Sequence, residues 1–97
     1  MKYVTIDGTV AVVKVSGIYG TQNVRAIEDE FSKAQENGCI NIMYDFTNTK
    51  AVESVGLTSI IKLNRKIKNK PKIKNANELI MRLIEASAMK KDFEFVE

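Results

Sequence analysis

The sequence predicts an α/β fold, a small mixed sheet of about four to five strands packed with about three to four helices. Segments in which apolar residues alternate, as in strands, are interleaved with segments in which apolar residues recur at helical spacing. Successive strands joined through a helix need crossover connections, so part of the sheet is expected to be parallel. The 97 residues contain no linker or repeat, and they indicate one domain over residues 1–97 with a single core.

The chain is expected to open with a β-hairpin. Residues 3–6 and 10–15 have the alternating strand pattern. The dipeptide Asp7-Gly8 between them suits a tight turn with positive backbone φ. Residues 16–20 are then expected to form a loop.

A helix and a buried strand follow the hairpin. The helix is expected to begin at Thr21 or Asn23, either of which can cap it, and to end at Asn37-Gly38. Residues 39–44 are the expected buried strand, and the lone Cys39 is predicted to be a buried reduced thiol. The inner face of the helix is predicted to carry Val24, Ile27, Phe31 and Ala34.

The buried strand is expected to end in a polar loop, residues 45–53, from which a second helix starts. Ser54 directly precedes an apolar-periodic segment, so its hydroxyl is a candidate N-cap that accepts a hydrogen bond from a first-turn N–H. Ser54 is therefore expected at a solvent-facing helix tip. The helix is predicted to run to about Ile67, with one face formed by Leu57, Ile60, Ile61 and Asn64.

The last third of the chain predicts a short strand, a third helix and a final strand. The strands are expected at residues 72–74 and 93–96. Asn77 is the candidate cap of the helix between them. The inner side of that helix is predicted to carry Leu79, Ile80, Leu83, Ile84 and Ala88.

The composition argues against catalysis by this chain. It contains no histidine, so no Ser–His or Cys–His relay can form, and Cys39 alone cannot supply an ordinary zinc site. We therefore expect no enzyme activity, no cofactor and no metal. No apolar run reaches membrane-spanning length and no signal region opens the chain, so a cytoplasmic protein is expected.

Three motifs carry a family resemblance. They are Val15-Ser16-Gly17, Tyr44-Asp45-Phe46-Thr47 and Glu53-Ser54-Val55-Gly56-Leu57. Together with the order of elements, they resemble the STAS domain of bacterial anti-sigma factor antagonists, and the likeness covers nearly the whole chain. In that family an aspartate-serine-serine-glycine-leucine motif carries the serine that the partner anti-sigma factor phosphorylates. By position that serine corresponds to Ser54.

The resemblance implies a regulatory binding module whose partner is an anti-sigma factor or a related serine kinase. Phosphorylation of Ser54 would switch the binding. The chain departs from the family pattern at Val55, which replaces a second hydroxyl residue, and at residues 18–20, which lack the usual acidic residue. It also departs at residues 66–74, which lack the usual glycines, and at residues 87–89, where serine-glycine-leucine is usual. The implied partner-binding residues are Asp45, Thr47, Glu53, Ser54, Val55 and Gly56.

Two alternatives remain open at the level of single residues. A phosphate on Ser54 would be tolerated by the helix N-terminus, and next to the Glu53 carboxylate it would disrupt an interface through repulsion. Alternatively, Ser54 is only a helix cap worth roughly 1 kcal/mol, and the chain binds a protein or an anionic ligand constitutively. Asp45 either belongs to the partner surface or bonds N–H groups of its own turn.

Residues 62–74 form a basic segment that contains no acidic residue. Such a run can attract an acidic protein face, nucleic acid or anionic lipid, or it can be a solvated helix end and edge strand. No aromatic residue interleaves with the lysines and no large apolar face accompanies them, so direct nucleic-acid or membrane binding is not expected. The sequence leaves the oligomeric state open. The basic residues are Lys62, Arg65, Lys66, Lys68, Lys70, Lys72 and Lys74.

Overall fold

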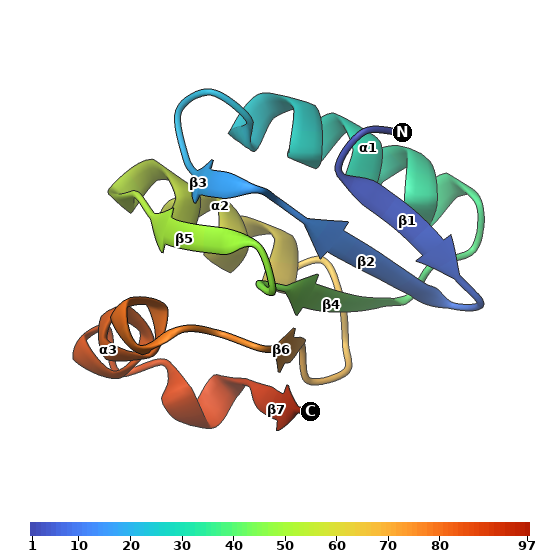
Figure 1. Cartoon of the computed structure of the whole chain (residues 1–97). Coiled ribbons are helices and arrows are strands. Elements are labelled where there is room, and N and C mark those ends of the chain that lie inside the picture. Colours follow the sequence, from blue (N-terminus) through green and yellow to red (C-terminus); the bar gives the residue numbers. More distant parts are fainter.

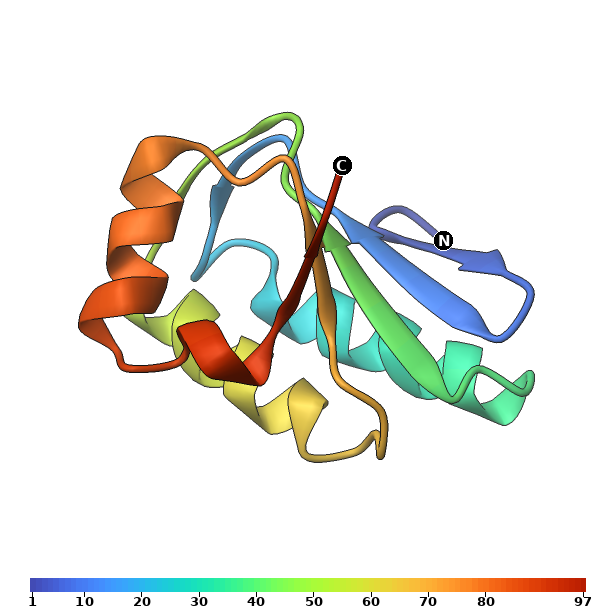
Figure 2. The same cartoon turned by 90° about the horizontal axis from the view of Figure 1, so that it is seen from below.

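The structure, a computed structural model, describes residues 1–97 and consists of two sheets with helices packed against them. The larger sheet has the strand order β1-β2-β4-β6-β7, and the smaller one pairs β3 with β5. Helices α1 and α2 lie on one face of the larger sheet, and α3 packs against β5 (Figure 1, Figure 2). In chain order the elements are β1 (Val4–Asp7), β2 (Val10–Lys14), β3 (Gly17–Tyr19), α1 (Val24–Glu36), β4 (Asn41–Asp45), β5 (Thr49–Val52), α2 (Ser54–Asn64), β6 (Lys72–Lys74), α3 (Glu78–Ala86), the 3-10 helix η1 (Lys90–Asp92) and β7 (Glu94–Val96).

The larger sheet is mixed, as the alternation of elements predicts. Strands β1 and β2 are antiparallel, whereas β2–β4, β4–β6 and β6–β7 are parallel. Val13, Tyr44 and Ile73 are register neighbours and all three are buried. Because successive side chains alternate between faces, the next register row, Lys14, Asp45 and Lys74, belongs to the opposite face, which carries no helix (Figure 2).

An aromatic cluster joins the two sheets in the core. The rings of Tyr19 from β3 and Tyr44 from β4 are 6.5 Å apart, and Phe46 lies 6.4 Å from Tyr19 and 5.9 Å from Tyr44. Phe93 extends the cluster to the start of β7, at 6.4 Å from Tyr44. The helices complete the core with buried side chains of Ile27, Phe31, Ala34, Ile60, Leu63, Ile80 and Ile84.

Several turns and caps follow the sequence prediction. The predicted hairpin is confirmed, with Gly8 at φ +63°. Its turn lies one residue later than expected, because Asp7 still pairs with Val10. Helix α1 ends where Gly38 adopts φ +97°. The Asn77 side chain caps α3 by accepting a hydrogen bond from the Ile80 N–H at 2.8 Å. Cys39 is buried, and this burial raises the pKa of its thiol.

The prediction of loops at residues 16–20 and 45–53 is wrong in part, because both contain short strands. Residues 17–19 form β3 and residues 49–52 form β5, and the two strands are parallel partners. Each strand is too short to show a periodic pattern of its own. Their pairing depends on contacts between segments about thirty residues apart, which local sequence patterns do not report.

Three expectations for the helices and the basic segment are also wrong. Helix α2 ends at Asn64 rather than near Ile67. On α3, Ile80 and Ile84 face the core, one turn apart, whereas Leu79 is 60% exposed and Ala88 lies beyond the helix end. Strand β6 is flanked by β4 and β7, so its two lysines are not on an edge strand. None of the helices is long and apolar enough to cross a membrane.

The backbone at Ala88 gives a test of the C-terminal part of the fold. Ala88 adopts φ +57°, a left-handed conformation in which a Cβ is unfavourable by roughly 1 kcal/mol. We expect Ala88→Gly to raise the free energy of unfolding by about 0.5–1 kcal/mol, measured by urea denaturation. The same change two residues earlier, Ala86→Gly within α3, should lower it by about 0.5–1 kcal/mol. Equal effects of the two substitutions would contradict this prediction.

Candidate functional site

The candidate site is the start of α2, where it meets the end of β3. Strands β3 and β5 run parallel, and each leads directly toward the first turn of a helix (Figure 1). The pairing continues past β5, because the Glu53 N–H donates to the Tyr19 carbonyl at 2.9 Å. The first turn of α2 therefore lies beside the loop that joins β3 to α1.

Glu53 ties this loop to the helix. Its carboxylate accepts a hydrogen bond from the Thr21 N–H at 2.9 Å. Gly20 makes this contact sterically feasible, since a Cβ at that position would overlap the Glu53 carboxylate. Asn23 closes the loop from the other side: its side chain accepts from the Gly20 N–H at 2.9 Å and donates to the Ile18 carbonyl at 2.8 Å.

The prediction that Ser54 is the N-cap is wrong by one residue. Glu53, in extended conformation at φ −77° and ψ 165°, is the N-cap, and Ser54 is the first residue of α2. The Glu53 side chain makes no cap bond because its carboxylate is used by Thr21. Ser54 is exposed and so is Val55, at 41%. The expected place of Ser54 at a solvent-facing helix tip is confirmed.

Gly56 sets how closely α2 approaches β3. It is buried, and a Cβ on it would overlap the Tyr19 carbonyl oxygen. This is the same carbonyl that accepts from the Glu53 N–H. The glycine of the motif therefore has a packing role, and its neighbours Ser54 and Val55 face solvent.

Asp45 and Thr47 lie at the other end of β5. The Asp45 carboxylate accepts hydrogen bonds from the backbone N–H and the hydroxyl of Thr47, and the Thr47 hydroxyl accepts from the Asn75 amide at 2.9 Å. Asp45 therefore bonds groups of its own turn, which is one of the two alternatives that the sequence leaves open for this residue. Strand β5, at about 3.3 Å per residue over four residues, separates this turn from Ser54 by roughly 13 Å.

The surroundings of Asp45 stabilise its charged form. Burial by itself would raise the pKa of the carboxyl, but the hydrogen bonds from Thr47 and the positive charges of Lys14 and Lys74 outweigh it. The net effect is a pKa below the usual value. Asp45 is thus a charged group that holds its own turn together.

The sequence reasoning missed the residues on the β3 side of the site. Tyr19, Gly20 and Thr21 touch Glu53 or Gly56 through backbone atoms, which leave no side-chain signature. The only signal available was the position of Gly20 between a strand and a helix cap. No group of three or more His, Cys, Asp or Glu side chains could hold a metal ion.

Comparison with known proteins identifies the fold. No protein-family model and no curated protein matches the sequence. Among solved structures, the phosphorylated form of the Bacillus cell fate determinant SpoIIAA matches with a TM-score of 0.76 and 13% identity, covering 97% of this chain and 89% of that one. An anti-sigma factor antagonist from Mycobacterium paratuberculosis matches with a TM-score of 0.78 and 20% identity, covering 95% and 80%.

A third solved structure agrees with these two. It is a provisionally assigned anti-sigma factor antagonist from Thermotoga maritima, with a TM-score of 0.84, 12% identity, and coverage of 97% of this chain and 84% of that one. At these identities the likeness concerns the fold. The chain has the STAS fold of anti-sigma factor antagonists, so the fold implied by the sequence motifs is confirmed.

The close approach of α2 to β3 at Gly56 can be tested by adding a single methyl group at this position, with the substitution Gly56→Ala. An alanine in place of a glycine usually stabilises a helix by about 1 kcal/mol. We expect the opposite sign for Gly56→Ala, a loss of about 1–3 kcal/mol, because the Cβ would overlap the Tyr19 carbonyl. Urea denaturation measures the effect, with Thr58→Ala on the exposed side of the same helix as control. A Gly56→Ala protein as stable as wild type would refute the packing.

The charge of Asp45 predicts a pH dependence. The pKa of Asp45 is lower in the folded state than in the unfolded state, where it is about 3.9. The carboxylate therefore stabilises the fold at pH values above the unfolded-state pKa, and this contribution is lost as the pH falls through the folded-state pKa. We therefore expect Asp45→Asn to destabilise the protein at pH 7 and to have a smaller effect near pH 3. Denaturation midpoints at the two pH values provide the measurement, and an unchanged difference would contradict it.

Proposed function

We propose that this chain, which has the fold of anti-sigma factor antagonists, is a regulatory binding module controlled at Ser54. Its partner in this proposal is an anti-sigma factor or a related serine kinase. The observation that carries the proposal is the exposed Ser54 at the first residue of α2, next to the carboxylate of Glu53. A hydroxyl at such a helix tip is accessible to a kinase.

Electrostatics explains how phosphorylation would act. A phosphoserine adds about −1.5 to −2 charges at pH 7. The first turn of α2 has no side-chain cap, so its free N–H groups and the helix dipole favour an anion there, and the fold would survive. A partner built around a neutral serine would instead meet a dense negative spot formed by the phosphate and Glu53. A loss of about 1.4 kcal/mol in binding corresponds to a tenfold weaker complex.

The proposed interface centres on the exposed residues of the helix start. Ser54 and Val55 would contact the partner directly, and Glu53 would hold the adjacent loop through Thr21. Gly56 would contribute by letting α2 approach β3. Asp45 and Thr47, at the far end of β5, would act on the interface only if the partner also covers that end of the strand pair.

The phosphoryl-transfer chemistry would belong to the partner. This chain would supply the acceptor hydroxyl, whereas the kinase would bind ATP and its metal ion. We accordingly assign the chain no catalytic residue and no cofactor, and we propose a cytoplasmic location. A constitutive binding module is the second candidate, because the uncapped first turn of α2 could hold an anionic group of a partner without any modification.

Labelling in a lysate of the source organism tests the regulation. We expect labelled ATP to place phosphate on the wild-type protein and peptide mass spectrometry to locate it at Ser54. Ser54→Ala should abolish the label, whereas Ser32→Ala, an exposed serine on α1, should leave it unchanged. No label, in a lysate that phosphorylates another substrate, would favour the constitutive module.

The effect of a negative charge at Ser54 on binding is tested with the partner, which is first isolated by affinity purification with the wild-type protein. Ser54→Glu should weaken the complex by about tenfold or more. Ser32→Glu adds the same charge elsewhere and should change affinity by less than about twofold, as expected for a solvent-exposed site outside the interface. Equal binding of Ser54→Glu and wild type would argue against regulation at this serine.

A further inference from the structure

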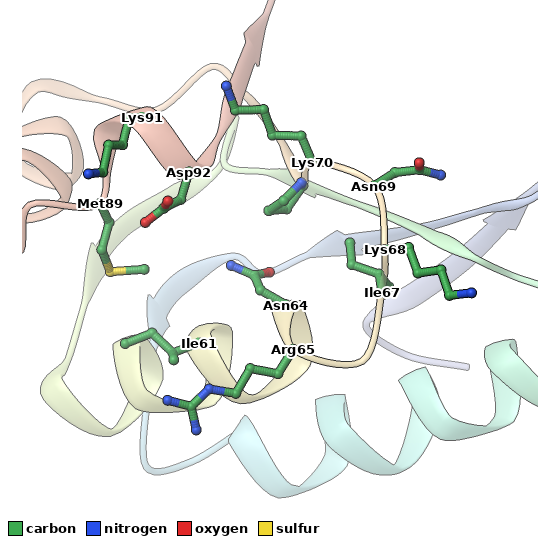
Figure 3. Close-up of a pocket in the computed structure, with 11 residues that line it drawn as sticks. Ile61, Asn64, Arg65, Ile67, Lys68, Asn69, Lys70, Met89, Lys91 and Asp92 are labelled. Atoms are coloured by element: carbon green, nitrogen blue, oxygen red, sulfur yellow. The ribbon is translucent and has the colours of Figure 1, made fainter.

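A second candidate site lies at the opposite end of α2. A cavity of about 450 Å³ opens between the C-terminal half of α2, the segment that leads to β6, and η1 (Figure 3). This volume is in the range of ligand pockets. Since α2 has eleven residues and rises 1.5 Å per residue, the cavity is roughly 15 Å away from Ser54.

The cavity has a strong excess of positive charge. Its lining contains Arg65, Lys68, Lys70 and Lys91, against a single carboxylate, Asp92. None of these five groups is in an ion pair. The three ion pairs of the structure, Lys62–Glu28, Arg82–Glu78 and Lys90–Glu85, involve other residues. No ion pair therefore neutralises the four basic side chains at the cavity.

Apolar side chains also line the cavity. Ile61 from α2, Ile67 from the following segment and Met89 before η1 are each half-buried. Figure 3 shows Ile61 on α2 and Met89 next to η1, both on the left of the view. An occupant that carries negative charge alone would leave this apolar surface in contact with water.

Two polar groups define what else the occupant must offer. Asn64 and Asp92 both point into the space between α2 and η1 (Figure 3). The Asn64 carbonyl oxygen accepts from the Tyr44 hydroxyl at 2.8 Å, which leaves its amide N–H groups as free donors. The Asp92 carboxylate accepts no hydrogen bond. The cavity therefore offers a free amide donor at Asn64 and a free carboxylate acceptor at Asp92.

We propose that this cavity binds a short acidic segment of a partner protein. Carboxylates of the segment would pair with Arg65, Lys70 and Lys91, and an apolar side chain would pack on Ile61 and Met89. The peptide backbone would supply the remaining groups, a carbonyl for the Asn64 amide and an N–H for Asp92. An inorganic phosphate or polyphosphate lacks both the N–H donor for Asp92 and the apolar side chain for Ile61 and Met89.

The proposal is independent of regulation at Ser54. It concerns the other end of α2 and invokes none of the residues around Glu53. A variant such as Ser54→Glu should leave binding at the cavity unchanged. The experiments can therefore contradict one of the two proposals without contradicting the other.

Fluorescence anisotropy with a labelled peptide of glutamates and leucines tests the proposal. We expect wild-type protein to bind it and the affinity to fall with added salt. Arg65→Gln/Lys91→Gln should weaken binding by about tenfold or more. The matched control, Arg25→Gln/Lys33→Gln, removes the same charge from exposed positions on α1 and should change affinity by less than about twofold. A peptide with glutamine in place of glutamate should not bind, and one with serine in place of leucine should bind more weakly.

Chemical-shift mapping on nitrogen-15-labelled protein locates the bound peptide. Shifts at Asn64, Met89 and Asp92 would support the proposal. It is overturned if the peptide fails to bind at millimolar concentration, or if the control variant loses as much affinity as Arg65→Gln/Lys91→Gln. Shifts at these three residues with tripolyphosphate or anionic vesicles, and none with the peptide, would overturn it in favour of a phosphate ligand.

Discussion

The contact between Tyr19 and the start of α2 is the constraint on which the rest of the structure depends. The Tyr19 carbonyl accepts the Glu53 N–H, and the same oxygen allows only a glycine at position 56. Its ring is fully buried among Tyr44 and Phe46. Through its carbonyl group, Tyr19 thus attaches the smaller sheet to α2. Through its ring, the same residue attaches the smaller sheet to the core. The exposure of Ser54 follows from this arrangement.

The hydroxyl of Tyr19 shows that packing outweighs hydrogen bonding at this position. It is buried beside Ser59 but forms no hydrogen bond of normal geometry, and the Ser59 hydroxyl donates to Glu28 instead; a buried hydroxyl left unpaired usually costs about 1–3 kcal/mol. Burial raises its pKa, so the group stays protonated. The hydroxyl of the neighbouring Tyr44, in contrast, has a hydrogen-bond partner, since it donates to the Asn64 side chain at 2.8 Å. Through Tyr44 the aromatic cluster extends to the far end of α2, so both ends of this helix are anchored on the same core.

The sequence predicted the features that depend on local chemistry. The hairpin glycine, the Asn77 cap and the exposure of Ser54 each follow from the residues within a turn or so, and the structure has all three. The strands β3 and β5 were missed because each is defined by the other, across the whole of α1 and β4. Ser54 was shifted from cap to first helical residue for the same reason: Glu53 is held by the backbone of β3.

The parallel pairing of the strands also determines the order in which the protein can fold. Only β1–β2 is a local hairpin, and the other four strand pairs are parallel and close over intervening helices. Pairing between distant segments waits for loop closure and is slow compared with hairpin or helix formation. Since β3 and β5 hold the start of α2, the surface around Ser54 comes into existence late, once the nonlocal contacts have formed. A partner of the kind proposed above, by recognising this surface, would distinguish the folded chain from its unfolded form.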